Sequence, residues 1–467
     1  NGSAFHASSP PCITTCIAAC PEHTGSVCRY CERCMTMWPF RRMTGATRRT
    51  QRGSVLRIRQ ERSVGLLILT DRDEVIVDRI ALPQAARAIW FGRGLLQRVE
   101  EAHIEAVLGR GNRLKAPACL AVVGAGSSKA VPVADAIARL RRMLRTAETL
   151  QVSGRADHAV VQSGVNAARR AQADVVLAVG GGTTLDVGKA IAALAHDGDA
   201  EDVEGFQTGR RQIDATKVLP WIAVPTTSGT GAESTNNAVI ELGDEKRSIR
   251  GIPPPELIMA DPALTDSLPF APTAIAAVDA LSQALEVLTG ADASPAVQSL
   301  SIEASVSLIK GMQSLLAAGA DIGPGVRDTL SWGSLLMGVA FAHARLGIPH
   351  ALVHHCARFR LAHGHMVGIL LPSAMRVQAG QPGVEQRLRL LESQLPEVAG
   401  GVLEWLDCSV PRLLARAGLP ASLSEAGLGL QDLEWIVRAE MAHEPMFGIP
   451  EHRANPHELL GVLSGAF

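Results

Sequence analysis

Histidine and carboxylate side chains suited to binding a metal are concentrated in the C-terminal half of the chain. His350 and His354 are four residues apart, and five of the 14 histidines fall within residues 350–365. Asp279 and Gln283 are also four residues apart, in an apolar stretch of helical period, so both lie on one buried face. A buried aspartate needs a partner or a cation. Histidines clustered with such an aspartate indicate a metal site or a proton relay.

A glycine-rich turn in the N-terminal half is suited to binding phosphate. Residues 175–179 form an apolar stretch typical of a buried strand, which leads into Gly180, Gly181 and Gly182 and then a helical stretch to Lys189. Three glycines allow a sharp turn and a close approach of the backbone to a ligand. The free N–H groups at the start of the helix favour pyrophosphate. The spacing matches neither G-x-G-x-x-G nor a Walker loop, so neither family is indicated.

A second polar loop follows another apolar strand, at residues 221–224. Residues 225–235 contain four threonines, two serines and two glycines. Hydroxyl groups and adaptable backbone at the carboxyl end of a strand are typical of ligand sites in open α/β sheets. Either loop alone is compatible with a surface turn, but the two together predict a nucleotide site.

Strands and helices alternate in the part of the chain that carries both loops. The hydrophobic pattern predicts strands at 87–92, 119–123, 174–179, 221–224, 238–241 and 257–260, and helices at 95–104, 132–150 and 156–172. Apolar strands separated by helices predict a parallel sheet covered on both faces. Beyond the seam at Asp261 and Pro262, residues 273–288, 296–316 and 327–344 are helical in period. We therefore expect an α/β domain followed by an all-α domain.

Length and charge exclude several classes of protein. A chain of 467 residues with 47% hydrophobic residues is long enough for more than one domain and a large core. Its 45 basic and 46 acidic residues argue against a nucleic-acid-binding protein held by phosphate contacts and against a polybasic membrane binder. No apolar run reaches the roughly 18–20 residues of a membrane span. We expect a cytoplasmic protein with no nucleic-acid or membrane partner.

The first 65 residues differ from the rest, because no hydrophobic periodicity is visible there and six of the nine cysteines lie within them. These are Cys12, Cys16, Cys20, Cys28, Cys31 and Cys34. The spacing of the last three is typical of iron–sulfur or zinc ligands, but a closed site needs a fourth ligand. We interpret residues 1–65 as a disordered leader or a mistaken gene start, with Met35, Met37 or Met43 as the true start. A metal-binding appendage is the alternative.

Together these motifs resemble the iron-containing alcohol dehydrogenase family, also called the group III dehydrogenases. The resemblance is carried by residues 180–189, 225–233, 260–262, 268–269, 279–286, 347–354, 363–364 and 370–372. It covers roughly residues 70–467, in the expected order. It implies a dinucleotide-binding α/β domain at 66–261, a helical domain at 262–467, and a metal and substrate site in the cleft between them. The dehydroquinate synthases share this architecture, but their motifs are different.

The resemblance also implies roles for particular residues. The metal ligands are Asp279, Gln283, His350 and His363, with Fe2+ as the first expectation and Zn2+ as the alternative. The residues expected to contact the cofactor, NAD or NADP, are Gly181, Gly182, Thr183, Asp186, Thr226, Thr227, Thr230 and Thr235. His354, one turn from a ligand, is expected to relay a proton to solvent. The implied activity is hydride transfer between a small-molecule alcohol and an aldehyde or ketone, by a homodimer.

Four positions depart from the family pattern. Gln283 stands where the family has histidine, and Gly124 stands where it has the aspartate that holds the adenosine ribose. Ser248 replaces an expected lysine, and residues 156–157 replace an Asn-Pro turn. A neutral amide is a poor substitute for imidazole at iron or zinc, although three ligands and a water form many catalytic zinc sites. The missing carboxylate at Gly124 makes the 2′-phosphate of NADP permissible.

Two other functions fit the same sequence. Arg358 and Arg360 lie shortly before His363, and arginine suits bidentate binding of a carboxylate. A maleylacetate reductase-like enzyme acting on an acidic substrate is therefore one alternative, although residues 226–231 match the alcohol dehydrogenase form of the second loop. The other alternative, motivated by Gln283, is a non-catalytic nucleotide-binding relative that has lost its metal.

Overall fold

The computed structural model describes most of the chain beyond residue 64. The described residues are 65–69, 74–77, 82, 84–108, 118–243, 245–318, 321–359, 361–442 and 454–467. The chain divides into two units, Asn1–Gln60 and Glu61–Phe467, and the second unit is the one described here. The cysteine-rich segment interpreted as a leader, with its alternative metal ligands, lies outside the described residues.

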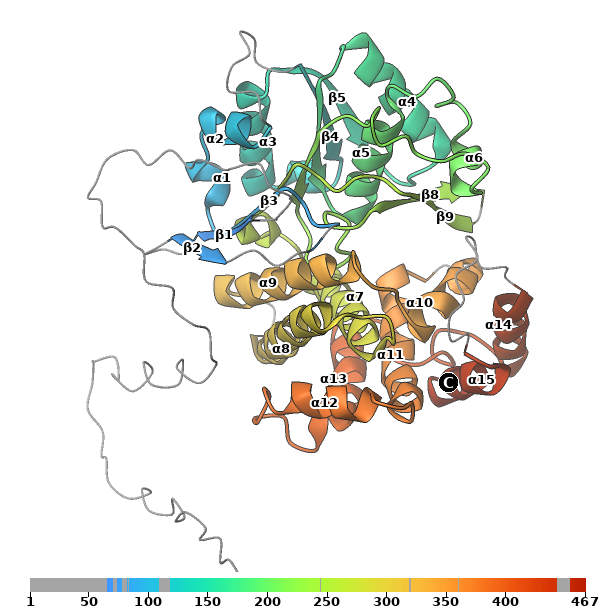
Figure 1. The fold of residues 1–467 in the computed structure, drawn as a ribbon. Coiled ribbons are helices and arrows are strands. Elements are labelled where there is room, and N and C mark those ends of the chain that lie inside the picture. Colours follow the sequence, from blue (N-terminus) through green and yellow to red (C-terminus); the bar gives the residue numbers. More distant parts are fainter. Residues whose placement is uncertain are drawn as a thin grey trace, which may run out of the picture. The chain divides into compact units, whose positions relative to one another are not determined.

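An eight-stranded sheet, parallel except at one edge, forms the centre of the N-terminal half of this unit (Figure 1). Its strand order is β2-β1-β3-β10-β7-β6-β4-β5. The strands are β1 (Gly65–Leu69), β2 (Glu74–Val77), β3 (Ala88–Phe91), β4 (Cys119–Gly124), β5 (Thr146–Val152), β6 (Val175–Gly180), β7 (Trp221–Pro225) and β10 (Leu257–Ala260). Only β2 is antiparallel to its neighbour. The predicted parallel sheet is therefore confirmed.

Helices cover both faces of the sheet, which explains the continuous apolar sequences of its central strands. These helices are α1 (Leu95–Arg98), α2 (Glu101–Val107), α3 (Val131–Met143), α4 (His158–Arg170) and α5 (Gly182–Leu194), and α6 (Val203–Gln207) follows them. On β4, Leu120 and Val122 pack into the cluster that includes residues of α4 and α5. The alternate residues Ala121 and Val123 pack into the cluster that includes residues of α1, α2 and α3. Both glycine-rich loops begin at the carboxyl edge of this sandwich.

The predicted helix over 132–150 is wrong in its second half. Helix α3 ends at Met143, Arg145 takes a left-handed conformation with φ of 45°, and strand β5 follows. β5 pairs only with β4 at the edge of the sheet, and its residues alternate between exposed and half-buried. An edge strand of this kind lacks the continuous apolar run that marks the buried parallel strands.

A separate antiparallel pair lies outside the main sheet. Strand β8 (Asn237–Leu242) contains the predicted strand 238–241, but it pairs with β9 (Glu245–Arg250) and not with the parallel strands. β9 has the polar sequence EKRSIR, so the hydrophobic pattern does not reveal it. β8 packs against α5 and continues directly from the second loop.

The C-terminal half is helical, as predicted. Its helices are α7 (Phe270–Thr289), α8 (Pro295–Ala318), α9 (Pro324–Phe341), α10 (Ile348–Val353), α11 (His363–Ala379), α12 (Val384–Glu392), α13 (Gly401–Arg416), α14 (Leu430–Ala442) and α15 (Pro456–Gly465). Helix α7 is central, because it packs against α8, α9, α11 and α13 and residues 277–289 are all buried. Among the helices that the structure describes, none has the length and apolarity needed to cross a membrane.

The two halves meet through close backbone contacts. After β10, the carboxylate of Asp261 accepts hydrogen bonds from the N–H groups of Gly94 and Leu96, which fixes the start of the connection to the helices. The second loop contacts α9 where Gly231 lies against Gly338: a Cβ at Gly231 would be 2.7 Å from the Cα of Gly338. Only a pair of glycines allows the loop to approach the helix this closely.

We expect Gly231→Ala to lower the free energy of unfolding by about 2–4 kcal/mol, because it combines backbone strain with overpacking. Gly231 has φ of 63°, and its added Cβ would overlap the α9 backbone. Chemical denaturation measures the change. Gly198→Ala is the matched control, because a Cβ there meets nothing within 4 Å. Equal stability of the two variants would contradict a tight joint at Gly231.

Candidate metal and nucleotide site

Three polar side chains project from the buried part of α7. Asp279, Gln283 and Glu286 follow one another at helical spacing, so they lie along one face. Their exposed fractions are 4%, 3% and 1%. Burying polar groups costs free energy unless each finds a partner. The groups that surround this face therefore decide what it can hold.

Two histidines from the next part of the chain face this side of α7. His350 is the third residue of α10, and His363 is the first residue of α11. The start of α11 lies close against α7, because a Cβ at Gly364 would be only 3.1 Å from the Cβ of Asp279. The missing side chain at Gly364 thus brings His363 beside Asp279.

The donor atoms of these three residues converge on one point. Oδ1 of Asp279 lies 3.4 Å from Nε2 of His350 and 4.0 Å from Nε2 of His363. The potential ligand atoms of all three lie within 4.8 Å of one another. Bonds of about 2.0–2.2 Å to one metal ion place neighbouring ligand atoms about 3–4 Å apart. The geometry therefore suits a single cation.

Glu286 fixes the orientation of the His350 ring. Its Oε1 lies 2.7 Å from Nδ1 of His350 and also accepts a hydrogen bond of 2.5 Å from the hydroxyl of Ser282. Its Oε2 accepts from the N–H of Gly347 at 2.7 Å. A carboxylate only accepts, so Nδ1 carries a proton, and Nε2, which faces Asp279, presents a lone pair once it has lost its own proton. This is the arrangement in which a carboxylate orients a metal-binding histidine.

Three buried atoms at this centre have no hydrogen-bond partner among the described residues. They are Oδ1 of Asp279, Oε1 of Gln283 and Nε2 of His350. When Nε2 of His350 is unprotonated all three are acceptors, and buried acceptors without a donor are rare in folded proteins. A divalent cation bound by Asp279, His350 and His363 would satisfy two of them, with Gln283 at a neutral fourth position. The residues present therefore fit a metal ion.

Burial and neighbouring charges set the protonation of this cluster. Burial opposes the charged form of His350, but Glu286 and Asp279 outweigh it and raise the pKa of His350 to about 10. Burial lowers the pKa of His363 to about 4. Burial favours the neutral form of Asp279, but the two histidines and a hydrogen bond from Gln283 hold its pKa below the usual value. A cation at this centre would displace a proton from His350, so binding would release a proton.

His354 lies on the outer side of the cluster. It follows α10 directly and is exposed, and its ring centroid is 6.3 Å from that of His363. This position is suited to exchanging protons between the cluster and solvent. Arg360 and the side chain of Arg358, on which the acidic-substrate alternative depends, lie outside the described residues.

The glycine turn between β6 and α5 touches the second loop. A Cβ at Gly182 would lie 2.6 Å from Oγ1 of Thr230, and one at Gly181 would lie 3.2 Å from Cγ2 of Thr227. Glycine therefore leaves room for the threonines and keeps the N–H groups at the start of α5 within reach of a ligand. The N–H groups at the start of α5 and the threonine hydroxyls of the second loop therefore lie close together, and donors of this kind are suited to binding a pyrophosphate.

The residues predicted to contact a cofactor fall into two groups by exposure. The accessible group is Gly181, Gly182, Thr183, Thr227 and Thr230. The buried group is Thr226, Asp186 and Thr235, with exposed fractions of 1%, 8% and 5%. Asp186 and Thr235 contact the buried ammonium group of Lys189. Oγ1 of Thr226 is buried and has no hydrogen-bond partner in the described part of the chain.

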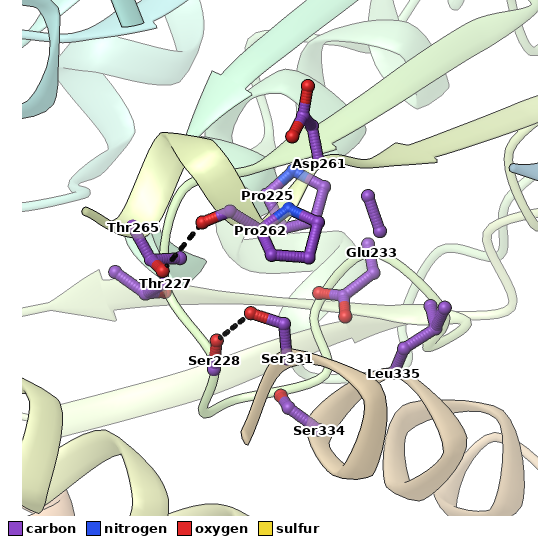
Figure 2. Close-up of a pocket in the computed structure, with 11 residues that line it drawn as sticks. Pro225, Thr227, Ser228, Glu233, Asp261, Pro262, Thr265, Ser331, Ser334 and Leu335 are labelled. Atoms are coloured by element: carbon purple, nitrogen blue, oxygen red, sulfur yellow. Dashed lines mark hydrogen bonds between the residues drawn. The ribbon is translucent and has the colours of Figure 1, made fainter. Parts of the chain in front are cut away.

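A pocket lies where the second loop meets the helical half (Figure 2). Figure 2 shows Glu233 of the loop and Ser331 and Ser334 of α9 lining it. Ser228 and Ser331 share a hydrogen bond of 2.8 Å, and burial raises the pKa of Glu233 to about 7. None of the metal-binding candidates lines the pocket, which borders the nucleotide loop through Thr227.

Known proteins match the chain along most of its length. The family model for iron-containing alcohol dehydrogenase matches residues 86–267, and the model for the C-terminal part of the same family matches residues 273–464. Long-chain-alcohol dehydrogenase 1 of Geobacillus thermodenitrificans is 32% identical over 283 residues, which cover 58% of this chain and 69% of that protein. The chain therefore belongs to the iron-containing alcohol dehydrogenase family, as the motifs predicted.

Solved structures share the fold. A 1,3-propanediol oxidoreductase matches with a TM-score of 0.69 and 24% identity, covering 82% of this chain and 98% of that chain. The maleylacetate reductase of Agrobacterium tumefaciens matches with a TM-score of 0.64 and 24% identity, covering 82% and 96%. At these identities the likeness shows the fold alone. The predicted α/β domain followed by a helical domain is confirmed.

Three residues at the site were not singled out from the sequence. Glu286 lies two turns beyond Asp279 on the same helix face, and that spacing is a signal that could have identified it. Lys189 and Glu233 lie within the two predicted loop motifs, but their contacts with distant residues leave no local pattern. Their roles become visible only when the loops are placed together.

We expect Glu286→Gln to weaken metal binding about 10–100-fold, because it removes the charge that orients His350. Competition with a fluorescent chelator measures the dissociation constant for Zn2+ or Fe2+. Glu303→Gln, which changes an exposed glutamate of α8, is the matched control and should bind as the wild type does. Equal affinities of all three proteins would contradict the role of Glu286.

Proposed function

We propose that this protein is a nicotinamide-dependent oxidoreductase that interconverts a small-molecule alcohol and an aldehyde or ketone. The observation that carries the proposal is the convergence of the potential ligand atoms of Asp279, His350 and His363, which lie within 4.8 Å of one another. Oδ1 of Asp279 and Nε2 of His350 are buried and have no hydrogen-bond partner among the described residues. Members of the family use NAD(H) and a divalent metal, and the chain offers a fitting site for each.

Asp279, His350 and His363 would hold the divalent metal, Fe2+ or alternatively Zn2+. Gln283 would complete the site through its amide oxygen or face a bound water. Two imidazoles and a carboxylate are the donor set of open non-haem iron sites, which leave positions for a substrate. A metal ion there lowers the pKa of an alcohol oxygen so that it ionises near neutral pH.

The remaining steps fall to side chains of this protein. Glu286 holds His350 in the tautomer that keeps Nε2 free. The exposed His354 would pass the proton of the substrate hydroxyl to solvent. A nicotinamide ring, when bound, would supply the acceptor or donor of the hydride. The buried, apolar surroundings of α7 keep bulk water from the reacting atoms and strengthen the electrostatic interactions among them.

The two loops would hold the nucleotide. Gly181, Gly182, Thr183, Thr227 and Thr230 form the accessible surface for the pyrophosphate. Thr226, Asp186 and Thr235 support that surface from behind.

Gly124 bears on the choice between NAD and NADP. A Cβ there would lie 2.7 Å from the hydroxyl oxygen of Ser127 and 2.9 Å from that of Thr184, so packing favours glycine. The position therefore offers no carboxylate to bind a ribose or to repel a 2′-phosphate. NAD and NADP are both candidates.

We also propose a division into two domains, an α/β nucleotide domain at residues 66–261 and a helical metal domain at 262–467. We propose that the protein is a cytoplasmic homodimer. Family membership supports the homodimer, and the balanced charge of the chain supports a small molecule as the partner, with no nucleic acid or membrane.

We expect Gln283→His to raise metal affinity about tenfold or more, because imidazole replaces a neutral amide. It should also raise kcat/KM for oxidation of simple alcohols with NAD+ or NADP+. Chelator competition measures the first, and formation of reduced nucleotide measures the second. Gln394→His, at an exposed position beyond α12, is the control and should change neither.

The same assays separate the alternatives. Binding of a nucleotide without metal or turnover, in the wild type and in Gln283→His alike, would favour a non-catalytic relative. Reduction of maleylacetate in preference to simple aldehydes, lost in Arg358→Ala or Arg360→Ala, would favour the acidic-substrate enzyme.

A further inference from the structure

Lys189 of α5 is completely buried, and its ammonium group has three acceptors. Nζ lies 2.6 Å from the carbonyl oxygen of Asn237, 2.9 Å from Oγ1 of Thr235 and 3.3 Å from Oδ1 of Asp186. An ammonium group has three N–H donors, so each of them has one acceptor. Lysine is almost never fully buried unless it is paired. This one joins parts of the chain that are far apart in sequence.

The partners of Lys189 lie in its own helix and at the end of the second loop. Asp186 lies in α5, the helix that begins with the glycine turn, whereas Thr235 and Asn237 mark the end of the second loop and the start of β8. Nζ of Lys189 also lies 5.6 Å from the ring centroid of Trp221, in the strand that leads into the second loop. Lys189 therefore extends from α5, the helix that follows the first loop. Its side chain contacts the segment before the second loop and the segment after it.

The relative position of the loops determines the surface that they present. The N–H of Thr226 donates to the carbonyl oxygen of Gly180 at 3.0 Å. A Cβ at Gly182 would lie 2.6 Å from Oγ1 of Thr230, so there is no spare room between the loops. A small shift of one loop against the other would change which N–H and hydroxyl groups reach a pyrophosphate together.

We propose that Lys189 is a positioning residue that locks the two loops into one preformed cradle for the nicotinamide nucleotide. This inference rests on the proposed function. Asp186 and Thr235 then act through Lys189 and not by touching the nucleotide. A preformed cradle avoids the cost of ordering two loops during binding, so its benefit is measured in nucleotide affinity.

Charge within the buried group supports this arrangement. Burial lowers the pKa of Lys189, and the charges of Asp186 and Glu233 oppose that effect. Asp186 pairs with Lys189 within α5. The charge of Glu233, in the second loop, attracts the same ammonium group from the loop side.

A purely structural role for Lys189 would also make its loss destabilising, because Asp186 would be left buried without its partner. The two roles differ in what they predict for nucleotide binding. Lys189→Met removes the lock, and Lys189→Met with Asp186→Asn removes it without leaving the carboxylate of Asp186 unpaired. Thr235→Val removes one hydrogen bond of the lock and leaves the charged pair intact.

Each variant is made in the full chain, and NADH and NADPH affinities are measured by fluorescence quenching, with KM and kcat for aldehyde reduction. We expect Kd and KM for the nucleotide to rise about tenfold in both Lys189 variants and about threefold in Thr235→Val. We expect kcat at saturating nucleotide to stay within about threefold of the wild type, because the contacts of Lys189 described above, with Asp186, Thr235, Asn237 and Trp221, include none of the metal-binding candidates. Thermal unfolding should show that the double variant is more stable than Lys189→Met.

Lys310→Met, on the surface of α8, is the control and should leave every constant unchanged. Folded variants with wild-type Kd and KM for the nucleotide would overturn the inference while leaving the proposed function intact. If Lys189→Met does not fold, the double variant and Thr235→Val decide by the same measure. A wild type that binds neither nucleotide would instead overturn the proposed function.

Discussion

The burial of Asp279 in the middle of α7 is the constraint on which the rest of the site depends. A carboxylate that is 4% exposed, with one oxygen that no described donor reaches, costs free energy unless a positive charge lies next to it. The nearby groups are arranged around that requirement. Gly364 lets His363 approach, and Glu286 turns the lone pair of His350 toward the same point. A metal ion bound there, as proposed, would compensate for all of these costs together, which no single hydrogen bond would do.

The second loop, part of the proposed nucleotide surface, also packs against the helical half. On one side it is held by Lys189, which reaches Thr235 and Asn237. On the other side it is held by α9, through the backbone contact of Gly231 with Gly338 and a hydrogen bond between serines. The loop therefore belongs to both halves of the structure. In the proposed function, its fixed position would let a nucleotide held by the α/β half face a substrate held by the helical half.

The sequence predicts the parts of this arrangement that depend on local patterns. The buried strands and the glycine turn can each be predicted from one short stretch of sequence. The same is true of the helical spacing of Asp279 with Gln283 and of His350 with His354. The edge strand β5 does not, because an exposed strand with alternating polar residues has no apolar run to mark it. The pairing of β8 with β9 and the contacts of Lys189 depend on residues brought together by the whole fold, so no local rule reveals them.

The candidate site is also predicted only in part from the sequence. The motifs place Gly181 and Thr230 in one nucleotide site, but only the structure shows that they are accessible while Asp186 and Thr235 are buried behind them. Glutamine at position 283 is a departure visible in the sequence. Only the structure shows that its amide oxygen is buried without a donor among the described residues. Gln283 therefore lacks the imidazole of the family pattern but still offers an acceptor atom.

The most direct test is anomalous diffraction from crystals of the full chain prepared with Fe2+ or Zn2+. We predict one peak at the centre of the cluster, bonded at about 2.0–2.2 Å to Asp279, His350 and His363. Crystals in which these three side chains contact only protein atoms, with the metal absent or bound elsewhere, would contradict a metal-dependent site on α7.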